Sequence, residues 1–301
     1  MRKVLFFALS PLYLLLIFGA PFAICASLYL SAPFLSLRLL VLFVAPILYS
    51  VLYLLIAALL SLPHQSAIIA GRFPRDIAHP IYFHRRLYGL CWTTVYYFVP
   101  IYHLALSLPL LKTVTFRLFG YRGHMGFTTY PDTWIRDLPL LRLGKGAYLS
   151  NKSTIGTNIA FPDGSILVES VTVEEGALVG HLAMLAPGVE IRKGAEIGVG
   201  ARIGLKSIIG KGAKINPCCS IEHGVKIGAH SKIGAVTYIA SAVTIAPDIV
   251  IPAGVTIPAR TRIRTQEEAQ FFAGHIEAAK LEKKSWGEDK QELSRFPLSH
   301  L

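Results

Sequence analysis

The sequence predicts a mainly β solenoid that is preceded by two transmembrane α-helices and followed by a C-terminal helix. Three observations lead to this fold class. Residues 1–71 contain two long apolar runs, an aliphatic residue recurs at every sixth position over residues 143–263, and a stretch rich in Glu, Ala and Lys follows. Neither an α-helix nor a β-strand has a period of six, so the repeat belongs to a unit larger than one element.

The apolar runs predict a transmembrane hairpin over residues 1–71. No charged residue lies within residues 4–37 or 39–71, and each run exceeds the roughly 20 apolar residues that span a bilayer. We expect helices over about residues 5–31 and 39–62. The first run is too long for a cleaved signal peptide.

Basic residues flank both runs. Arg2 and Lys3 precede the first run, and Asp76 alone opposes the basic residues that follow the second, namely Arg72, Arg75, Arg85, Arg86, Lys112, Arg117 and Arg122. By the positive-inside rule both ends of the hairpin are cytoplasmic, which predicts a multi-pass protein of the bacterial inner membrane with its solenoid in the cytosol. Because the net charge of +12 is concentrated near the apolar runs, a lipid bilayer is favoured as partner over nucleic acid.

Residues 72–142 form a membrane-proximal segment. Residues 87–111 are a third apolar run interrupted by Pro100 and Pro109, and they contain an aromatic cluster made of Trp92, Tyr96, Tyr97, Phe98 and Tyr102. This composition is typical of the headgroup region. We expect an interfacial or re-entrant helix pair here, with a third span as the alternative.

The six-residue register runs without a break from Leu143 to Ile263. A second column of small or β-branched residues lies two positions before each next aliphatic, from Ala147 to Thr261, and glycine often follows the aliphatic. We expect both columns to point into the solenoid and the glycine to supply a corner conformation that other residues disfavour. Residues 264–301 predict a terminal helix and tail.

This pattern resembles the hexapeptide-repeat acyltransferase superfamily, and the segment WIRDLPLLRLG at residues 134–144 is similar to its membrane-attached members. The resemblance covers about residues 143–263 and implies a left-handed parallel β-helix with three hexads per coil. Residues 18 apart would then stack at about 4.8 Å, with two charge-poor corners and one charged corner. The resemblance also implies a homotrimer whose active sites lie between subunits, with a histidine general base and acetyl-CoA or another acyl-CoA as donor.

Two histidines are candidates for the general base. His181 and His223 lie at equivalent hexad positions on the two charge-poor corners, and Asp163 is expected one coil below His181, where it would orient the imidazole. His223 lies in CSIEHGVKIG, similar to the segment around the catalytic histidine of sialic-acid O-acetyltransferases and sugar N-acetyltransferases, although Gly224 stands where these often have Asp or Glu. Both candidates remain open, and so does the interpretation that both histidines only line an interface.

The charges on the repeat give candidates for binding the donor. Lys206, Lys211 and Arg260 are the candidate contacts to CoA phosphates, although each alone is typical of a solvated charge. No metal is expected, because His181, His223 and His230 fall on different surfaces and the 4 cysteines show no paired ligand spacing.

The predicted function is acyl transfer from acyl-CoA to a hydroxyl or amine of an envelope sugar or a lipid-linked intermediate. Asn158 stands where many relatives of this superfamily have a histidine, which weakens the transfer of any particular substrate. The alternative function is a non-catalytic scaffold of a membrane complex.

Overall fold

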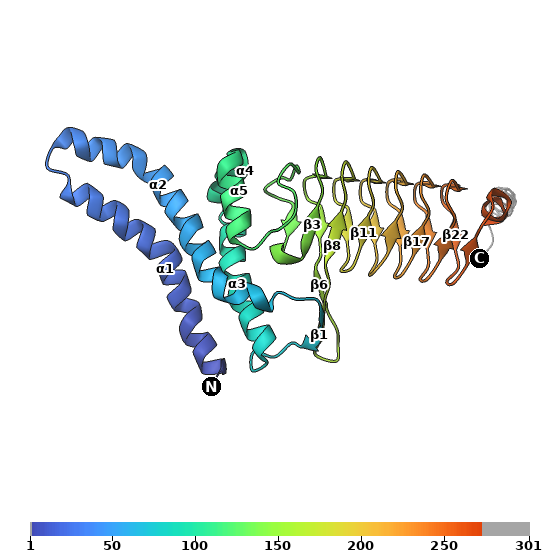
Figure 1. Ribbon diagram of the computed structural model, residues 1–301, viewed down its shortest axis with the longest axis horizontal. Helices are drawn as coiled ribbons and strands as arrows, with labels where there is room; N and C mark the ends of the chain where they lie inside the picture. Colours follow the sequence, from blue (N-terminus) through green and yellow to red (C-terminus); the bar gives the residue numbers. More distant parts are fainter. Residues whose placement is uncertain (1, 273–301) are drawn as a thin grey trace, which may run out of the picture.

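The computed structural model describes residues 2–272 (Figure 1). Two long helices at the N-terminus lead into a group of shorter helices, and a solenoid extends from these to the C-terminal end of the described chain. Residues 266–272 are helical, as predicted, and the rest of the predicted C-terminal helix and tail lies outside the described residues.

The N-terminal hairpin consists of α1 (Arg2–Ser31) and α2 (Leu35–Ser61), which is followed by the 3-10 helix η1 (Leu62–Ala67). The spans Arg2–Ser31 and Leu35–Ala67 are each long and apolar enough to cross a membrane. Arg38 lies inside α2 and not in the break between α1 and α2. Its Nε donates a hydrogen bond to the carbonyl of Ala32, in the break, at 2.9 Å. The predicted pair of long apolar helices is confirmed, with α2 beginning a turn earlier than expected.

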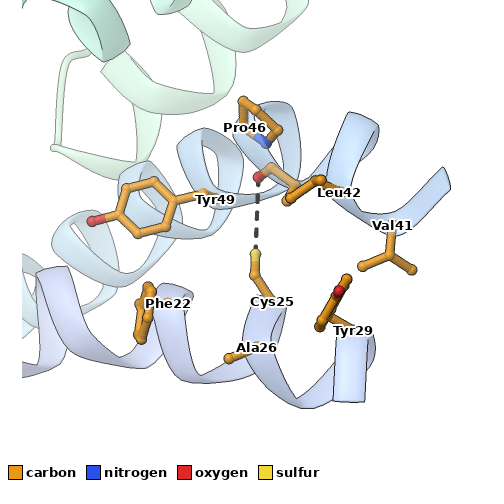
Figure 2. Close-up of a pocket in the computed structure, with 9 residues that line it drawn as sticks. Phe22, Cys25, Ala26, Tyr29, Val41, Leu42, Pro46 and Tyr49 are labelled. Carbon is orange, nitrogen blue, oxygen red and sulfur yellow. Dashed lines mark hydrogen bonds between the residues drawn. The ribbon is translucent and has the colours of Figure 1, made fainter. Parts of the chain in front are cut away.

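A cavity of about 360 Å³ lies between α1 and α2 (Figure 2). Aromatic and aliphatic side chains surround it, including Phe22, Tyr29 and Tyr49, and Cys25 directs its Sγ at the carbonyl of Ala45 across 3.9 Å. No charged side chain lines this cavity. It is therefore not a place for acid–base chemistry.

Three shorter helices connect the hairpin to the solenoid: α3 (Pro80–Tyr97), α4 (Val99–Ser107) and α5 (Pro109–Leu118). The axes of α4 and α5 are bent by 114°, as in a broken or re-entrant pair. The aromatic cluster is largely internal, however: Trp92 and Tyr102 are fully buried, whereas Tyr97 is 69% exposed. Its assignment to lipid headgroups is wrong for the buried members, because they form a core shared by the helices and the solenoid.

The solenoid winds through three parallel sheets in about seven turns. The first sheet contains β2 (Trp134–Ile135), β5 (Thr154–Ile155), β10 (Met184–Leu185), β13 (Arg202–Ile203), β16 (Ser220–Ile221), β19 (Tyr238–Ile239) and β22 (Thr256–Ile257). The second contains β3 (Leu141–Leu143), β8 (Val171–Val173), β11 (Glu190–Ile191), β14 (Ile208–Ile209), β17 (Lys226–Ile227), β20 (Thr244–Ile245) and β23 (Arg262–Ile263). The third contains β4 (Tyr148–Leu149), β9 (Leu178–Val179), β12 (Glu196–Ile197), β15 (Lys214–Ile215), β18 (Lys232–Ile233) and β21 (Val250–Ile251). The parallel solenoid is confirmed, and its left-handed winding stays a prediction.

The register agrees with the predicted columns. From β8 onward, each strand pairs with the strand 18 residues further on, as in Glu190↔Ile208. Every aliphatic of the six-residue column is buried except Phe161 and Leu167. Polar residues in the small column satisfy their hydrogen bonds on the next coil, as where the Ser207 hydroxyl donates to the carbonyl of Glu222 at 2.9 Å. From Leu141 to Ile263 the interior is thus closed without buried charges.

The glycines of the repeat serve a different purpose from the one expected. A Cβ on Gly180 would lie 2.7 Å from the carbonyl oxygen of Ile197, so glycine is needed for close approach between coils. The left-handed corner conformation occurs two positions later, at glycines such as Gly194 and also at Leu182 (φ 58°) and Val236 (φ 58°). The expectation that the glycine after the aliphatic provides the corner conformation is wrong.

A hairpin interrupts the first coils. Strand β4 pairs with β9 at an offset of 30 residues, as in Tyr148↔Leu178, so twelve residues beyond the regular eighteen are inserted here. The insertion contains β6 (Asn158–Ala160) and β7 (Ser165–Val168), which form an antiparallel sheet with β1 (Gly71–Pro74). Strand β1 follows the two long apolar helices, so this small sheet joins them to the solenoid.

Each coil has three corners, which stack into three edges along the solenoid. We name them by their side chains. The apolar edge contains residues 150–153, 180–183, 198–201, 216–219, 234–237 and 252–255; the groove edge contains residues 186–189, 204–207, 222–225, 240–243 and 258–261; the charged edge contains residues 144–147, 174–177, 192–195, 210–213, 228–231 and 246–249.

Candidate functional site

His181 lies on the apolar edge, directly after β9. Its ring is half-buried, and Nδ1 lies 3.1 Å from Oδ1 of Asn151 on the coil below. An amide oxygen only accepts hydrogen bonds, so this contact places the proton of the neutral ring on Nδ1. The lone pair of Nε2 is then free, as a general base requires.

Asp163 is not below His181. It lies in the inserted hairpin, exposed, where it pairs with Arg72 at 2.5 Å and accepts hydrogen bonds from the hydroxyl and backbone N–H of Ser165. These two hydrogen bonds from Ser165, together with the Arg72 charge, lower the pKa of Asp163. The predicted stacking is wrong because the insertion shifts the register, so Asn151 occupies the position expected for Asp163.

One signal in the sequence marks this insertion. The tripeptide Pro162–Gly164 consists of residues that favour tight turns. It lies between the two strands of the hairpin. The register prediction failed because Phe161 and Leu167 preserve the six-residue step although neither is a wall residue. Asn151 was consequently overlooked.

His223 lies on the groove edge and is exposed. Its Nδ1 accepts a hydrogen bond from the backbone N–H of Leu205 at 3.0 Å, so the proton of the neutral ring is on Nε2. In this state the exposed nitrogen donates a hydrogen bond and does not accept a proton. The ring is one wall of a groove of about 470 Å³ that runs past Tyr238 and Met184 to Asn158 in the hairpin.

The candidate CoA contacts do not converge. Lys206 and Arg260 are both on the groove edge but three coils apart, and Lys211 is on the charged edge. Lys206 forms an ion pair with Glu169 at 3.0 Å. Their role in donor binding stays a prediction.

The apolar edge is exposed beside His181. Leu182 is 52% exposed, Val199 47% and Val236 68%. Leu182 and Val236 also hold the left-handed conformation that leucine and valine rarely adopt. The same conformation occurs at the third position of corners on the other two edges, as at Lys206 and His230, so it belongs to the repeat, whereas the exposed apolar side chains are particular to this edge. Among residues 2–272 no group of three or more His, Cys, Asp and Glu side chains is arranged to hold a metal ion.

Comparisons with known proteins bear on the repeat. Residues 206–241 match the family model described as bacterial transferase hexapeptide (six repeats). No curated protein matches the chain.

Several solved structures have a similar fold. One is the UDP-N-acetylglucosamine acyltransferase of Francisella novicida, at 13% identity and a TM-score of 0.30, covering 48% of this chain and 61% of that one. Another is the acetyltransferase domain of PglB from Neisseria gonorrhoeae in complex with acetyl coenzyme A, at 18% identity and a TM-score of 0.25, covering 49% and 61%. A third is a mutant perosamine N-acetyltransferase from Caulobacter crescentus in complex with CoA and GDP-perosamine, at 18% identity and a TM-score of 0.19, covering 51% and 58%.

The chain thus spans about three fifths of the length of each of these three structures. Residues 206–241 of the solenoid therefore carry the bacterial transferase hexapeptide repeat.

Proposed function

We propose that the protein is a membrane-anchored acyltransferase that uses acyl-CoA, with acetyl-CoA the favoured donor, and His181 as general base. The observation that carries the proposal is the contact between His181 Nδ1 and Asn151 Oδ1 at 3.1 Å, which leaves Nε2 able to accept a proton. The matched transferase hexapeptide repeat supports the reaction class.

In the proposed reaction, Nε2 of His181 takes the proton of an acceptor hydroxyl or amine as that group attacks the thioester carbonyl carbon. The C–O or C–N bond forms, the C–S bond breaks, and the CoA thiolate leaves with the proton that His181 returns. Asn151 keeps the ring oriented throughout, because its Oδ1 accepts from Nδ1–H in both the neutral and the protonated ring.

The exposed apolar edge supports a homotrimer as the active assembly. With Leu182, Val199 and Val236 covered by a neighbouring subunit, His181 would lie at a subunit boundary. The groove at His223, on another edge of the solenoid, is suited to an extended donor or acceptor. The acceptor class we propose is an envelope sugar or a lipid-linked intermediate, because the two apolar helices would hold the enzyme at the cytosolic face of the inner membrane.

Release of CoA thiol from acetyl-CoA by the full chain in detergent, with bacterial lipid extract as acceptor, tests the proposal. His181→Ala should lower the rate by about 10²–10⁴-fold, the range for losing a general base. His223→Ala should raise KM rather than lower kcat, because His223 lines the groove and is not the base, and His230→Ala on the charged edge is the matched control. A His181→Ala variant with wild-type turnover would contradict the assignment, and absence of acetyl-CoA binding to the wild-type chain would favour the scaffold function.

A further inference from the structure

A polar cavity of about 260 Å³, apart from the groove at His223, lies between α3, the inserted hairpin and the first coil of the solenoid. Its lining includes four arginines and no carboxylate: Arg75, Arg85, Arg86 and Arg136, together with Tyr82, Asn158, Ala160 and Ile166. The arginines come from the residue after β1, from α3 and from the first coil of the solenoid. Guanidinium groups in so small a space repel one another unless an anion separates them.

Arg85 gives the cavity a fixed cationic wall. Its side chain is 1% exposed and pairs through Nη2 with Asp137, which is itself fully buried. The Asp137 carboxylate also accepts a hydrogen bond from Thr157 at 2.5 Å and is directed inward by a left-handed backbone (φ 54°). Nη1 of Arg85 is buried and has no hydrogen-bond partner among residues 2–272. A buried unpartnered guanidinium nitrogen is costly, and a ligand oxygen in the cavity would satisfy it.

Arg136 is held in a second fixed position. Its guanidinium lies over Gly89 of α3, where a Cβ would be only 3.0 Å from Nη2. Its Nε is buried without a hydrogen-bond partner in the described chain and lies 3.9 Å from Asp137 Oδ1, which is likewise buried and unpartnered. Asp137 is thus the one carboxylate that balances Arg85 and Arg136, while Arg75 and Arg86 add two further positive charges at the exposed side of the cavity.

The cavity lies beside the N-terminal end of α1. The Arg86 guanidinium is 6.0 Å from the ring of Phe6, and Arg2 donates to the carbonyl of Ala78 at 3.3 Å. The exposed arginines thus lie next to the first turns of α1, so a ligand held at the proposed membrane surface would be close to them.

We propose that this cavity binds a phosphoryl group, as a phosphate monoester or a diphosphate. Guanidinium forks match the oxygens of a phosphoryl group in pairs, and several arginines suit a multiply charged anion better than a single carboxylate. Tyr82 and Asn158 supply neutral donors for the remaining oxygens. Phosphatidic acid, a lipid-linked sugar phosphate and a soluble nucleotide all present this chemistry.

Asn158 also lines the groove that contains His223, so the two spaces meet at this residue. The phosphoryl group is therefore placed as part of the acceptor, whose remainder extends along the groove. This second step rests on the proposed acyltransferase function, whereas phosphoryl binding does not.

Calorimetric titration of the full chain with inorganic pyrophosphate tests the site. Changing both exposed arginines, Arg75→Gln and Arg86→Gln, should raise the apparent Kd by about tenfold or more, because two charged contacts are lost while the buried Arg85–Asp137 pair stays intact. The matched control changes Arg262→Gln and Arg264→Gln, two exposed arginines at the far end of the solenoid. Absence of pyrophosphate binding to the wild-type chain, or equal binding by both double variants, overturns the proposal.

The source of the phosphoryl group follows from the same titration in nanodiscs. Competition by phosphatidic acid in the disc, compared with phosphatidylcholine alone, supports a lipid-borne ligand, and undiminished pyrophosphate binding supports a soluble one. Inhibition of acyl transfer by pyrophosphate, lost in the Arg75→Gln and Arg86→Gln variant, supports the acceptor assignment. Binding without inhibition overturns that assignment alone, and a catalytically inactive chain that still binds pyrophosphate overturns the proposed function alone.

Discussion

The apolar edge and the charged edge have the same backbone but different side chains. Both have tight glycine contacts between coils and a left-handed residue at the third corner position. On the charged edge, Glu174 accepts hydrogen bonds from Arg192 and from the Lys193 N–H, each at 2.8 Å. On the apolar edge, Leu182 and Val199 are exposed beside His181. The repeat thus determines the shape of a corner and leaves its second and third positions free for assembly and chemistry.

The largest effect we expect tests the shared backbone. A Cβ would lie 2.6 Å from backbone atoms of the next coil at Gly198 on the apolar edge and at Gly210 on the charged edge. Gly198→Ala and Gly210→Ala should therefore each lower the free energy of unfolding by about 1–3 kcal/mol. Gly194→Asn is the control, because a Cβ there meets nothing within 4 Å and asparagine tolerates the left-handed conformation. Chemical denaturation measures all three, and a loss at one edge only would show that the edges differ in backbone packing.

The next prediction concerns the chemistry of the apolar edge. Asn151→Leu should lower turnover by about tenfold and shift its pH dependence, because the His181 ring loses the acceptor that fixes its tautomer. Asn151→Asp should restore turnover at neutral pH, since a carboxylate also accepts from Nδ1–H. Asp163→Asn should leave turnover unchanged, as this residue pairs with Arg72 in the hairpin. A rate that falls with Asp163→Asn and not with Asn151→Leu would contradict the site.

A smaller effect is expected for the assembly, where one substitution should dissociate the trimer and at the same time stabilise the subunit. Leu182→Asn should dissociate the proposed trimer and yet raise the free energy of unfolding of the subunit by about 1 kcal/mol, because asparagine relieves the left-handed strain. His230→Asn on the charged edge, at φ 58°, should give the same relief and leave the assembly intact. Light scattering after size-exclusion chromatography measures the mass. A Leu182→Asn chain that remains assembled would show that this edge is not an interface.

The smallest expected effect distinguishes the edges by pH. Burial acts to raise the pKa of Glu174, but hydrogen bonds from Arg192 and Lys193 outweigh it and lower that pKa. A lowered folded pKa stabilises the fold above the ordinary glutamate pKa, and this contribution is lost as the pH falls through the lowered value. Glu174→Gln should therefore cost about 0.5 kcal/mol at neutral pH and nothing in strong acid. Val199→Thr on the apolar edge should change the free energy of unfolding by the same amount at neutral pH and in strong acid. Denaturant unfolding curves of both variants at the two pH values measure this.

The sequence was sufficient for the parts of the fold that repeat. The six-residue column predicted the buried wall, because any polar replacement such as one at Ile191 would disrupt a closed interior. The same column did not predict the inserted hairpin, because Phe161 and Leu167 keep the six-residue spacing by coincidence. Which residue lies one coil below His181 depends on the number of residues in that coil. Because the coil is twelve residues longer than expected, the residue below His181 is Asn151 and not Asp163. The arginine cavity was beyond prediction because Arg75 and Arg136 meet only through the folded hairpin.

The pairing of β1 with β7 has a mechanical consequence. Gly71↔Val168 and Pro74↔Ser165 are the ends of a ladder between the chain leaving the two N-terminal helices and the solenoid, and α3 shares a core with the first coils. The connection is therefore made by backbone hydrogen bonds as well as by packing, which opposes rotation of the helices against the solenoid. In the proposed membrane-anchored enzyme, a substrate held in the bilayer would meet the same coil in every catalytic cycle.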